Sequence, residues 1–209
     1  EYILENDTTG FKLTENVKLT IPAKSAEAIN IKANYELIDP VLSRYWYNNM
    51  GLTTNELKAT VTKIEFVKVA SLPIVNGTTV FDVSNNANDA VTGQIVTSGD
   101  DKIVIISALD VIKAPSNCQE LFSMFVSVAE IDFANFTVTS STTNMSWMFC
   151  ACHSLGDLDL SSWDTSNVTS MSLLFHNMQA IEKVYVGSKW KTSSVTSSED
   201  MFYNCPLLP

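Results

Sequence analysis

A repeat in the C-terminal half constrains the fold more than any other feature of this chain. The chain has Met-Phe or Leu-Phe pairs at intervals of 24, 26 and 27 residues, and these pairs end at Phe125, Phe149, Phe175 and Phe202. Periods of roughly 20 to 50 residues are typical of proteins built from stacked structural units. One such unit cannot bury its apolar face alone, so neighbouring repeats are expected to pack against one another.

Further columns follow the same period. Short strands are predicted at 131–133, 158–160 and 184–186, because apolar residues alternate there. A bulky aromatic residue follows each strand, and a turn rich in Ser and Thr comes next. The predicted repeat core consists of Phe125, Phe149, Cys152, Leu155, Leu158, Leu160, Trp163, Phe175, Val184, Val186, Trp190 and Phe202.

The spacing of Leu155, Leu158 and Leu160 matches the L-x-x-L-x-L pattern of leucine-rich repeats. The run "NMSWMFCACHSLGDLDLSSWDTSNVTSMSLLF" resembles the BspA-like leucine-rich repeats of bacterial surface proteins, in the lipoprotein-type subgroup with a repeat of about 26 residues. The resemblance covers residues 45–209 and is strongest from Glu120 onward. It implies a secreted or surface-anchored protein, and some members of that family act as adhesins or antigens.

We therefore predict an α+β fold in two parts. Residues 1–115 form a β-rich, sandwich-like or irregular region, and residues 116–209 form about three repeats of a leucine-rich-repeat-like solenoid with parallel strands and short helical turns. In the first part, β-branched runs predict strands at 16–23, 28–38, 59–70, 78–84, 92–97 and 102–107. A helix is expected from Pro40 to Asn49, with Asp39 as its N-cap. The strand at 102–107 is expected to lie beside the first repeat and cap the solenoid.

Charge and hydropathy limit the possible partners. The net charge is −10 and Arg44 is the one arginine, which argues against binding to a nucleic acid backbone. No apolar run approaches the roughly 18 residues of a membrane span. Glu1 opens the chain without a basic and apolar leader, so we expect any signal peptide either to have been removed or to lie outside this sequence. We expect a monomer at the cell surface or outside the cell.

Two of the four cysteines, Cys152 and Cys205, are expected not to form a disulfide with each other. Cys152 and Cys205 share a column two repeats apart, about 9 to 10 Å, which is too far for a disulfide. We interpret both as small buried apolar residues, and leave the state of Cys118 and Cys150 open. A zinc site can be drawn from Cys150, His153 and His176, but a structural site needs four ligands at short spacings. No metal and no cofactor is predicted.

The outward positions of the predicted strands form a candidate partner-binding face. Its residues are Asp132, Asp157, Asp159, Lys183 and Tyr185. Repeat proteins commonly bind partners on such a surface, and we expect a host or extracellular matrix protein, or a glycan that stacks on Tyr185. The predicted function is therefore non-catalytic binding or adhesion.

Three other interpretations remain open. The same face could be merely solvated, since exposed charge is normal. The chain could be a structural stalk or spacer within a larger envelope protein. A more remote alternative is a glycan-cleaving enzyme that uses Asp157 and Asp159, whose carboxyl groups would lie about 6 to 7 Å apart on one strand face.

Overall fold

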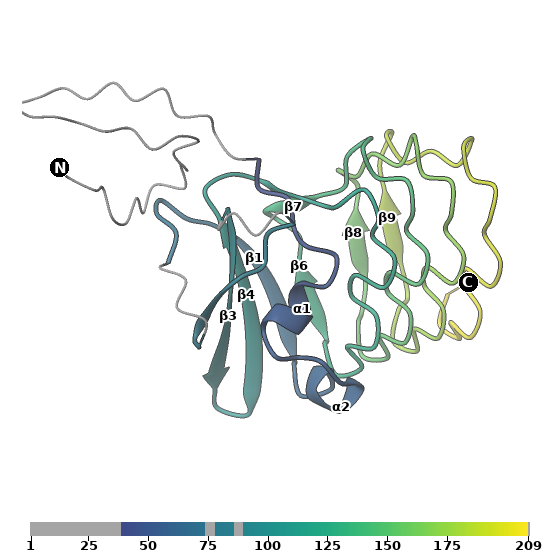
Figure 1. Cartoon of the computed structure of the whole chain (residues 1–209). Coiled ribbons are helices and arrows are strands. Elements are labelled where there is room, and N and C mark those ends of the chain that lie inside the picture. Colours follow the sequence, from purple (N-terminus) through teal and green to yellow (C-terminus); the bar gives the residue numbers. More distant parts are fainter. Residues whose placement is uncertain (1–38, 74–77, 86–89, 209) are drawn as a thin grey trace, which may run out of the picture.

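The computed structural model describes residues 39–73, 78–85 and 90–208, so the strands expected at 16–23 and 28–38 lie outside the described residues. The described residues are rich in β-structure (Figure 1). A mixed sheet has the strand order β2-β3-β4-β1-β6. Its strands are β1 (Lys63–Lys68), β2 (Val80–Asp82), β3 (Val91–Ser98), β4 (Asp101–Ala108) and β6 (Glu130–Asp132). Two small parallel sheets pair β5 (Ile112–Lys113) with β7 (Phe136–Thr137), and β8 (Leu158–Leu160) with β9 (Val184–Val186).

The predicted fold class is wrong. Helices in the described part of the chain are limited to α1 (Trp46–Asn49) and α2 (Asn55–Lys58), of four residues each, and both precede the repeats. The molecule is a β-rich protein of small mixed sheets, and not an α+β chain ending in a leucine-rich-repeat-like solenoid with helical turns. In the described residues before the repeats, β1, β2, β3 and β4 all belong to the one mixed sheet.

The repeats pair with one another through short parallel contacts. Parallel bridges join Asn117 to Asn144, Asn144 to Ser170, and Ser170 to Ser197. In Figure 1 the repeats lie side by side beyond the mixed sheet, with β8 and β9 adjacent. Equivalent backbone positions in successive repeats therefore pair with one another.

The rings of Phe122, Phe149, Phe175 and Phe202 form one column through the repeats. Successive ring centroids are 5.5, 5.8 and 5.3 Å apart, and each pair is stacked. The equivalent residues are thus 27, 26 and 27 positions apart, and the first interval of 24 is wrong. Phe125 stands outside the column because it stacks on Trp46 of α1, with centroids 5.5 Å apart.

A turn segment around each column ring explains why the repeats contain no helix. The four turn segments are residues 120–124, 147–151, 173–177 and 200–204. The first and last residue of each has a positive φ of 50–67°: Glu120 and Met124, Trp147 and Ala151, Leu173 and Asn177, Asp200 and Asn204. The left-handed residues at both ends of each turn segment interrupt the succession of right-handed backbone dihedral angles that an α-helix needs.

These turn segments hold the repeats together through a regular set of hydrogen bonds. The N–H groups of Phe122, Phe149 and Phe175 donate to carbonyl oxygens of the following repeat, at 2.9, 3.0 and 2.9 Å. Alternate residues on either side of each ring do the same. The first repeat therefore has carbonyls that face away from its neighbour and need other donors.

Three side chains from the region before the repeats supply those donors. Arg44 Nε donates to the carbonyl of Gln119 at 2.8 Å, and Trp46 Nε1 donates to that of Leu121 at 3.0 Å. Lys58 Nζ donates to the carbonyl of Ser123 at 3.3 Å. We call Arg44, Trp46 and Lys58 the donor cap, because they replace the N–H groups that a preceding repeat would offer.

One hydrophobic core crosses the boundary predicted at residue 115. Its buried residues run from Leu42 to Ile181. Among them, Phe66 of β1 lies 6.0 Å from Phe122, measured between ring centroids. Most of the predicted repeat core is buried, namely Phe125, Phe149, Cys152, Leu155, Leu158, Leu160, Trp163 and Phe175. Val184 and Trp190 are partly buried, whereas Val186 and Phe202 are each 49% exposed.

Two local predictions need correction. The strand β4 does not lie beside the first repeat, because β1 stands between β4 and β6 and pairs in parallel with both. The helix expected from Pro40 begins only at Trp46. Val41 and Leu42 instead form bridges to Lys113 and Ser84, and this extended pairing prevents a helix from starting there.

Candidate binding face on the repeats

The five predicted binding residues are all exposed and lie on or next to the strands of the repeats. Asp132 is on β6, Asp159 on β8 and Tyr185 on β9. Asp159 and Tyr185 are direct partners in the β8–β9 register. Asp157 and Lys183 immediately precede β8 and β9. We call these five residues the strand face.

The aspartates of the strand face have local structural roles. Asp132 Oδ1 accepts the N–H of Ala134 at 2.8 Å, and Asp159 Oδ1 accepts the N–H of Ser161 at 2.9 Å. Both contacts shape the turn that follows the strand. Asp157 Oδ1 accepts the N–H of Lys183 at 2.8 Å and so joins two repeats. Each of the three carboxylates therefore has a hydrogen-bond donor within the protein, and its position can be explained without a bound ligand.

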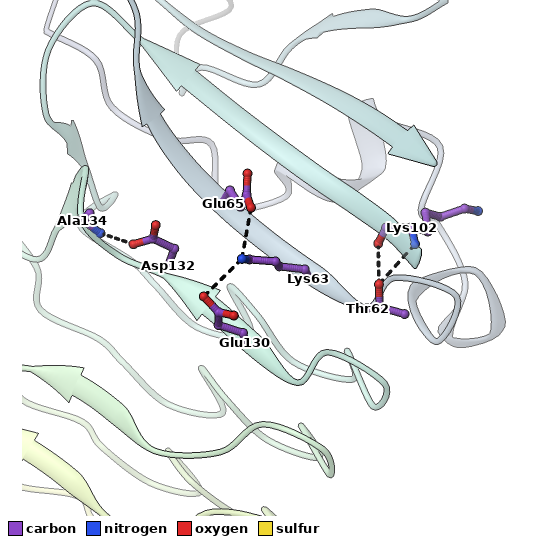
Figure 2. Close-up of polar contacts among 7 residues, drawn as sticks. All are labelled: Thr62, Lys63, Glu65, Lys102, Glu130, Asp132 and Ala134. Carbon is purple, nitrogen blue, oxygen red and sulfur yellow. Dashed lines mark hydrogen bonds and ion pairs between the residues drawn. The ribbon is translucent and has the colours of Figure 1, made fainter. Parts of the chain in front are cut away.

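The polar surface continues from the repeats onto β1 (Figure 2). Lys63 Nζ lies 3.2 Å from Glu65 Oε1 and 3.2 Å from Glu130 Oε1, and thus bridges β1 and β6. Hydrogen bonds to these two carboxylates raise the pKa of Lys63. Because the group is open to solvent, this contact adds little stability. It does show that the exposed strand surface spans both parts of the chain.

Lys183 and Tyr185 are the strand-face side chains best placed to meet a partner. Tyr185 is 50% exposed. No hydrogen bond or ion pair of either side chain is found within the described ranges 39–73, 78–85 and 90–208. An exposed tyrosine next to a lysine offers apolar area, a hydroxyl group and a positive charge.

The pair Asp157 and Asp159 gives little support to acid–base catalysis. A glycosidase needs one carboxyl group with a raised pKa that can donate a proton. The Ser161 contacts instead lower the pKa of Asp159, so its carboxylate stays ionised at neutral pH. Asp157 accepts a backbone N–H across the repeat boundary. Both groups are more consistent with structural roles.

Sequence reasoning missed two rows of side chains that cross the turn segments. Trp147, His176 and Tyr203 form an aromatic row, with ring centroids 6.3 and 5.2 Å apart. His153, Asn177 and Asn204 form an amide row beside it. Asn177 Nδ2 lies 2.9 Å from His153 Nε2, and Asn204 Nδ2 donates to Asn177 Oδ1 at 2.5 Å. The sequence signal was the equivalent repeat position of Cys150, His176 and Tyr203, two of which are aromatic.

The cysteines are free, and neither a disulfide nor a group of three metal ligands occurs in the part of the chain that the structure describes. Cys118, Cys150 and Cys152 are buried, and Cys205 is partly exposed. The thiols of Cys152 and Cys205 donate to the carbonyls of Phe122 and Phe175, at 3.0 and 2.9 Å. These thiols therefore help to join one repeat to the preceding one.

We expect the three buried thiols to resist iodoacetamide at pH 8 while Cys205 reacts first. Burial raises the pKa of Cys118 and Cys152 to about 12 and that of Cys150 to about 11. The unfolded chain loses these protons from about the ordinary value of 9.0 upward, so the free energy of unfolding should fall as the pH rises from there. Mass spectrometry of the labelled chain and urea unfolding at pH 8 and pH 10 measure the two effects. Equal labelling of all four thiols in the native chain would contradict this account.

Comparison with known proteins adds one finding. Residues 116–208, less than half of the chain, match a family model described as "Mycoplasma protein of unknown function, DUF285". No curated protein and no solved structure matches the chain. The matched segment begins and ends with the repeats, so the similarity concerns the part that carries the strand face.

Neither described helix could cross a membrane, because each has only four residues.

Proposed function

We propose that this chain is a non-catalytic binding module, secreted or displayed at the cell surface, that contacts a host or extracellular matrix protein or a glycan through its strand face. The observation that carries the proposal is the exposed pair Lys183 and Tyr185 at β9, a strand that pairs in parallel with β8, whose Leu158 and Leu160 are buried. The resemblance to BspA-like surface repeats supports the location and the adhesive role. The net charge of −10 supports a partner other than a nucleic acid.

A spacer is the second candidate, and the shared core favours it. Because one cluster of buried residues has members from both parts of the chain, between Leu42 and Ile181, the two parts would hold a fixed geometry. The aspartates of the strand face also have structural partners, as a spacer would require. A spacer depends on stability and tolerates changes at exposed side chains.

The test is a binding screen of the chain against extracellular matrix proteins and glycans by biolayer interferometry. We expect a hit whose affinity falls at least about ten-fold when Lys183→Ala and Tyr185→Ala are combined, since exposed aromatic anchors dominate such interfaces. The matched control combines Lys189→Ala with Tyr45→Ala, which removes the same residue types elsewhere on the surface. A ligand that binds both double variants as tightly as the parent chain would argue against the strand face and favour the spacer.

A further inference from the structure

The last turn segment, residues 200–204, carries backbone donors that have no acceptor. In the preceding turn segment, residues 173–177, the first, third and fifth N–H groups donate to carbonyl oxygens of the last repeat at 2.9, 2.9 and 2.8 Å. The equivalent N–H groups of Asp200, Phe202 and Asn204 find no acceptor in the part of the chain that the structure describes. The last repeat lies at the end of the array that is farthest from the mixed sheet (Figure 1).

Apolar side chains are uncovered at the same end. Val186 and Phe202 are each 49% exposed, whereas Leu160 and Phe175, which occupy the equivalent positions one repeat earlier, are buried. The interface that buries one repeat against the next therefore continues onto a face without a neighbour among the described residues. We call Val186, Asp200, Phe202 and Asn204 the end face.

The backbone of the end face already has the conformation of a paired turn segment. Asp200 and Asn204 have φ angles of 50° and 56°, in the range of the other three turn segments. Inside the segment the N–H of Tyr203 donates to the carbonyl of Asp200 at 3.1 Å, and the N–H of Cys150 donates to that of Trp147 in the same way. A partner would therefore meet a preformed row of donors, which lowers the cost of binding.

The donor pattern argues against a second copy of this chain as the partner. A two-fold interface would place the N–H groups of one end face opposite the same N–H groups of the other, without acceptors between them. The carbonyls that would match, at residues 119, 121 and 123 of another copy, already accept from its donor cap. The acceptors are therefore expected from a different polypeptide.

We propose that the end face binds an extended segment of a partner polypeptide, which adds to the array as a further repeat would. The partner supplies carbonyl oxygens to the three free N–H groups and an aromatic or aliphatic side chain to Phe202, as every repeat contact within the chain does. In strand addition of this kind, main-chain hydrogen bonds give affinity and side-chain contacts give specificity. Glu199 and Asp200 carry negative charge here, so the segment is uncharged or basic.

The probe for this proposal is a synthetic peptide of residues 170–180 with blocked ends. In the native chain its carbonyls at 172, 174 and 176 accept from the turn segment of residues 147–151, and its Phe175 stacks on Phe149. It therefore offers the acceptors and the ring that the end face lacks, without a carboxylate. The same peptide with Phe175→Ser is the control probe.

The experiment is a titration of the whole ¹⁵N-labelled chain with this peptide, followed by NMR. We expect shifts at the amides of Asp200, Phe202 and Asn204, a Kd of about 1 mM or tighter, and slower hydrogen exchange of these three amides in the complex. Phe202→Ala should weaken binding at least about ten-fold. Val96→Ala, which removes an exposed apolar side chain from β3, should leave the affinity unchanged.

Three results would overturn the proposal. They are the absence of shifts at the end-face amides at about 5 mM peptide, equal binding of the Phe175→Ser probe, and self-association of the chain through Phe202 in sedimentation equilibrium, which would make a second copy the occupant. The double variant Lys183→Ala and Tyr185→Ala should bind the peptide as the parent chain does. A matrix protein captured through Lys183 and Tyr185 would still support the strand face if the end face failed this test.

Discussion

Replacement of Phe149 by alanine is expected to lower the free energy of unfolding by about 3–5 kcal/mol. Phe149 is fully buried and stacks between Phe122 and Phe175, at 5.5 and 5.8 Å. It also lies 6.1 Å from the ring of Trp163. The truncation opens a cavity in the middle of the ring column, where neighbours on both sides are fixed by the hydrogen bonds between repeats. Urea unfolding followed by circular dichroism measures the change.

Phe202 provides the matched control. It occupies the same column position and stacks on Phe175 at 5.3 Å, but it is 49% exposed. Phe202→Ala should therefore cost less than half as much as Phe149→Ala, because burial and not ring identity sets the loss. Equal costs at the two positions would show that the column does not stabilise the chain through burial.

Trp46→Ala should destabilise the chain by a similar amount, about 3–5 kcal/mol. Trp46 is fully buried, stacks on Phe125 and donates to the carbonyl of Leu121. Trp46→Phe keeps an apolar ring but leaves that carbonyl without its donor, which should cost about 1–3 kcal/mol. The difference between the two variants separates ring packing from the hydrogen bond of the donor cap.

Trp147→Phe is the control for both Trp46 variants. Trp147 is 38% exposed, so the loss of its indole N–H leaves no buried group unpaired and should change stability by less than about 0.5 kcal/mol. Thermal unfolding of the three variants under one buffer condition gives the comparison. A Trp46→Phe variant as stable as Trp147→Phe would remove the support for a capping role of the indole N–H.

The sequence indicated much of the strand structure but not the fold class. The runs that became β1, β3 and β4 were visible because they are rich in β-branched residues, and the period indicated that neighbouring repeats make contact. The turn segments were mistaken for helical turns because their left-handed residues include Trp147, Ala151 and Leu173, none of which favours that conformation. The N–H groups of these three residues donate to carbonyl oxygens of the next repeat, and these bonds support the left-handed conformation.

The error in the repeat register and the failure to predict the donor cap had a common cause. The pair Met124-Phe125 repeats the letters of Met148-Phe149, but Phe125 packs on Trp46, and Leu121-Phe122 occupies the equivalent position. Similarity between two short sequence motifs cannot reveal a contact with residues almost 80 positions away. For the same reason nothing in the sequence indicated that Arg44 and Lys58 donate to backbone carbonyls of the first repeat.

The candidate site was predicted only in part. Alternation along the strands placed Asp132, Asp159 and Tyr185 on the outside, and all three are exposed. The sequence did not distinguish carboxylates that bind a partner from carboxylates that accept a backbone N–H two residues later. That distinction depends on the turn geometry after each strand, which the structure provides.

The central claim is that the region before the repeats caps them and forms one cooperative unit with them, on which the strand face depends. Native-state hydrogen exchange tests it most directly, through the amides of Val104 and Ile106 on β4 and of Phe149 and Phe175 in the repeats. We predict that both sets exchange with the same opening free energy in the parent chain, and that Trp46→Ala lowers both by the same amount. If the amides of β4 keep their protection in Trp46→Ala while those of the repeats lose theirs, the two parts are independent and the account is contradicted.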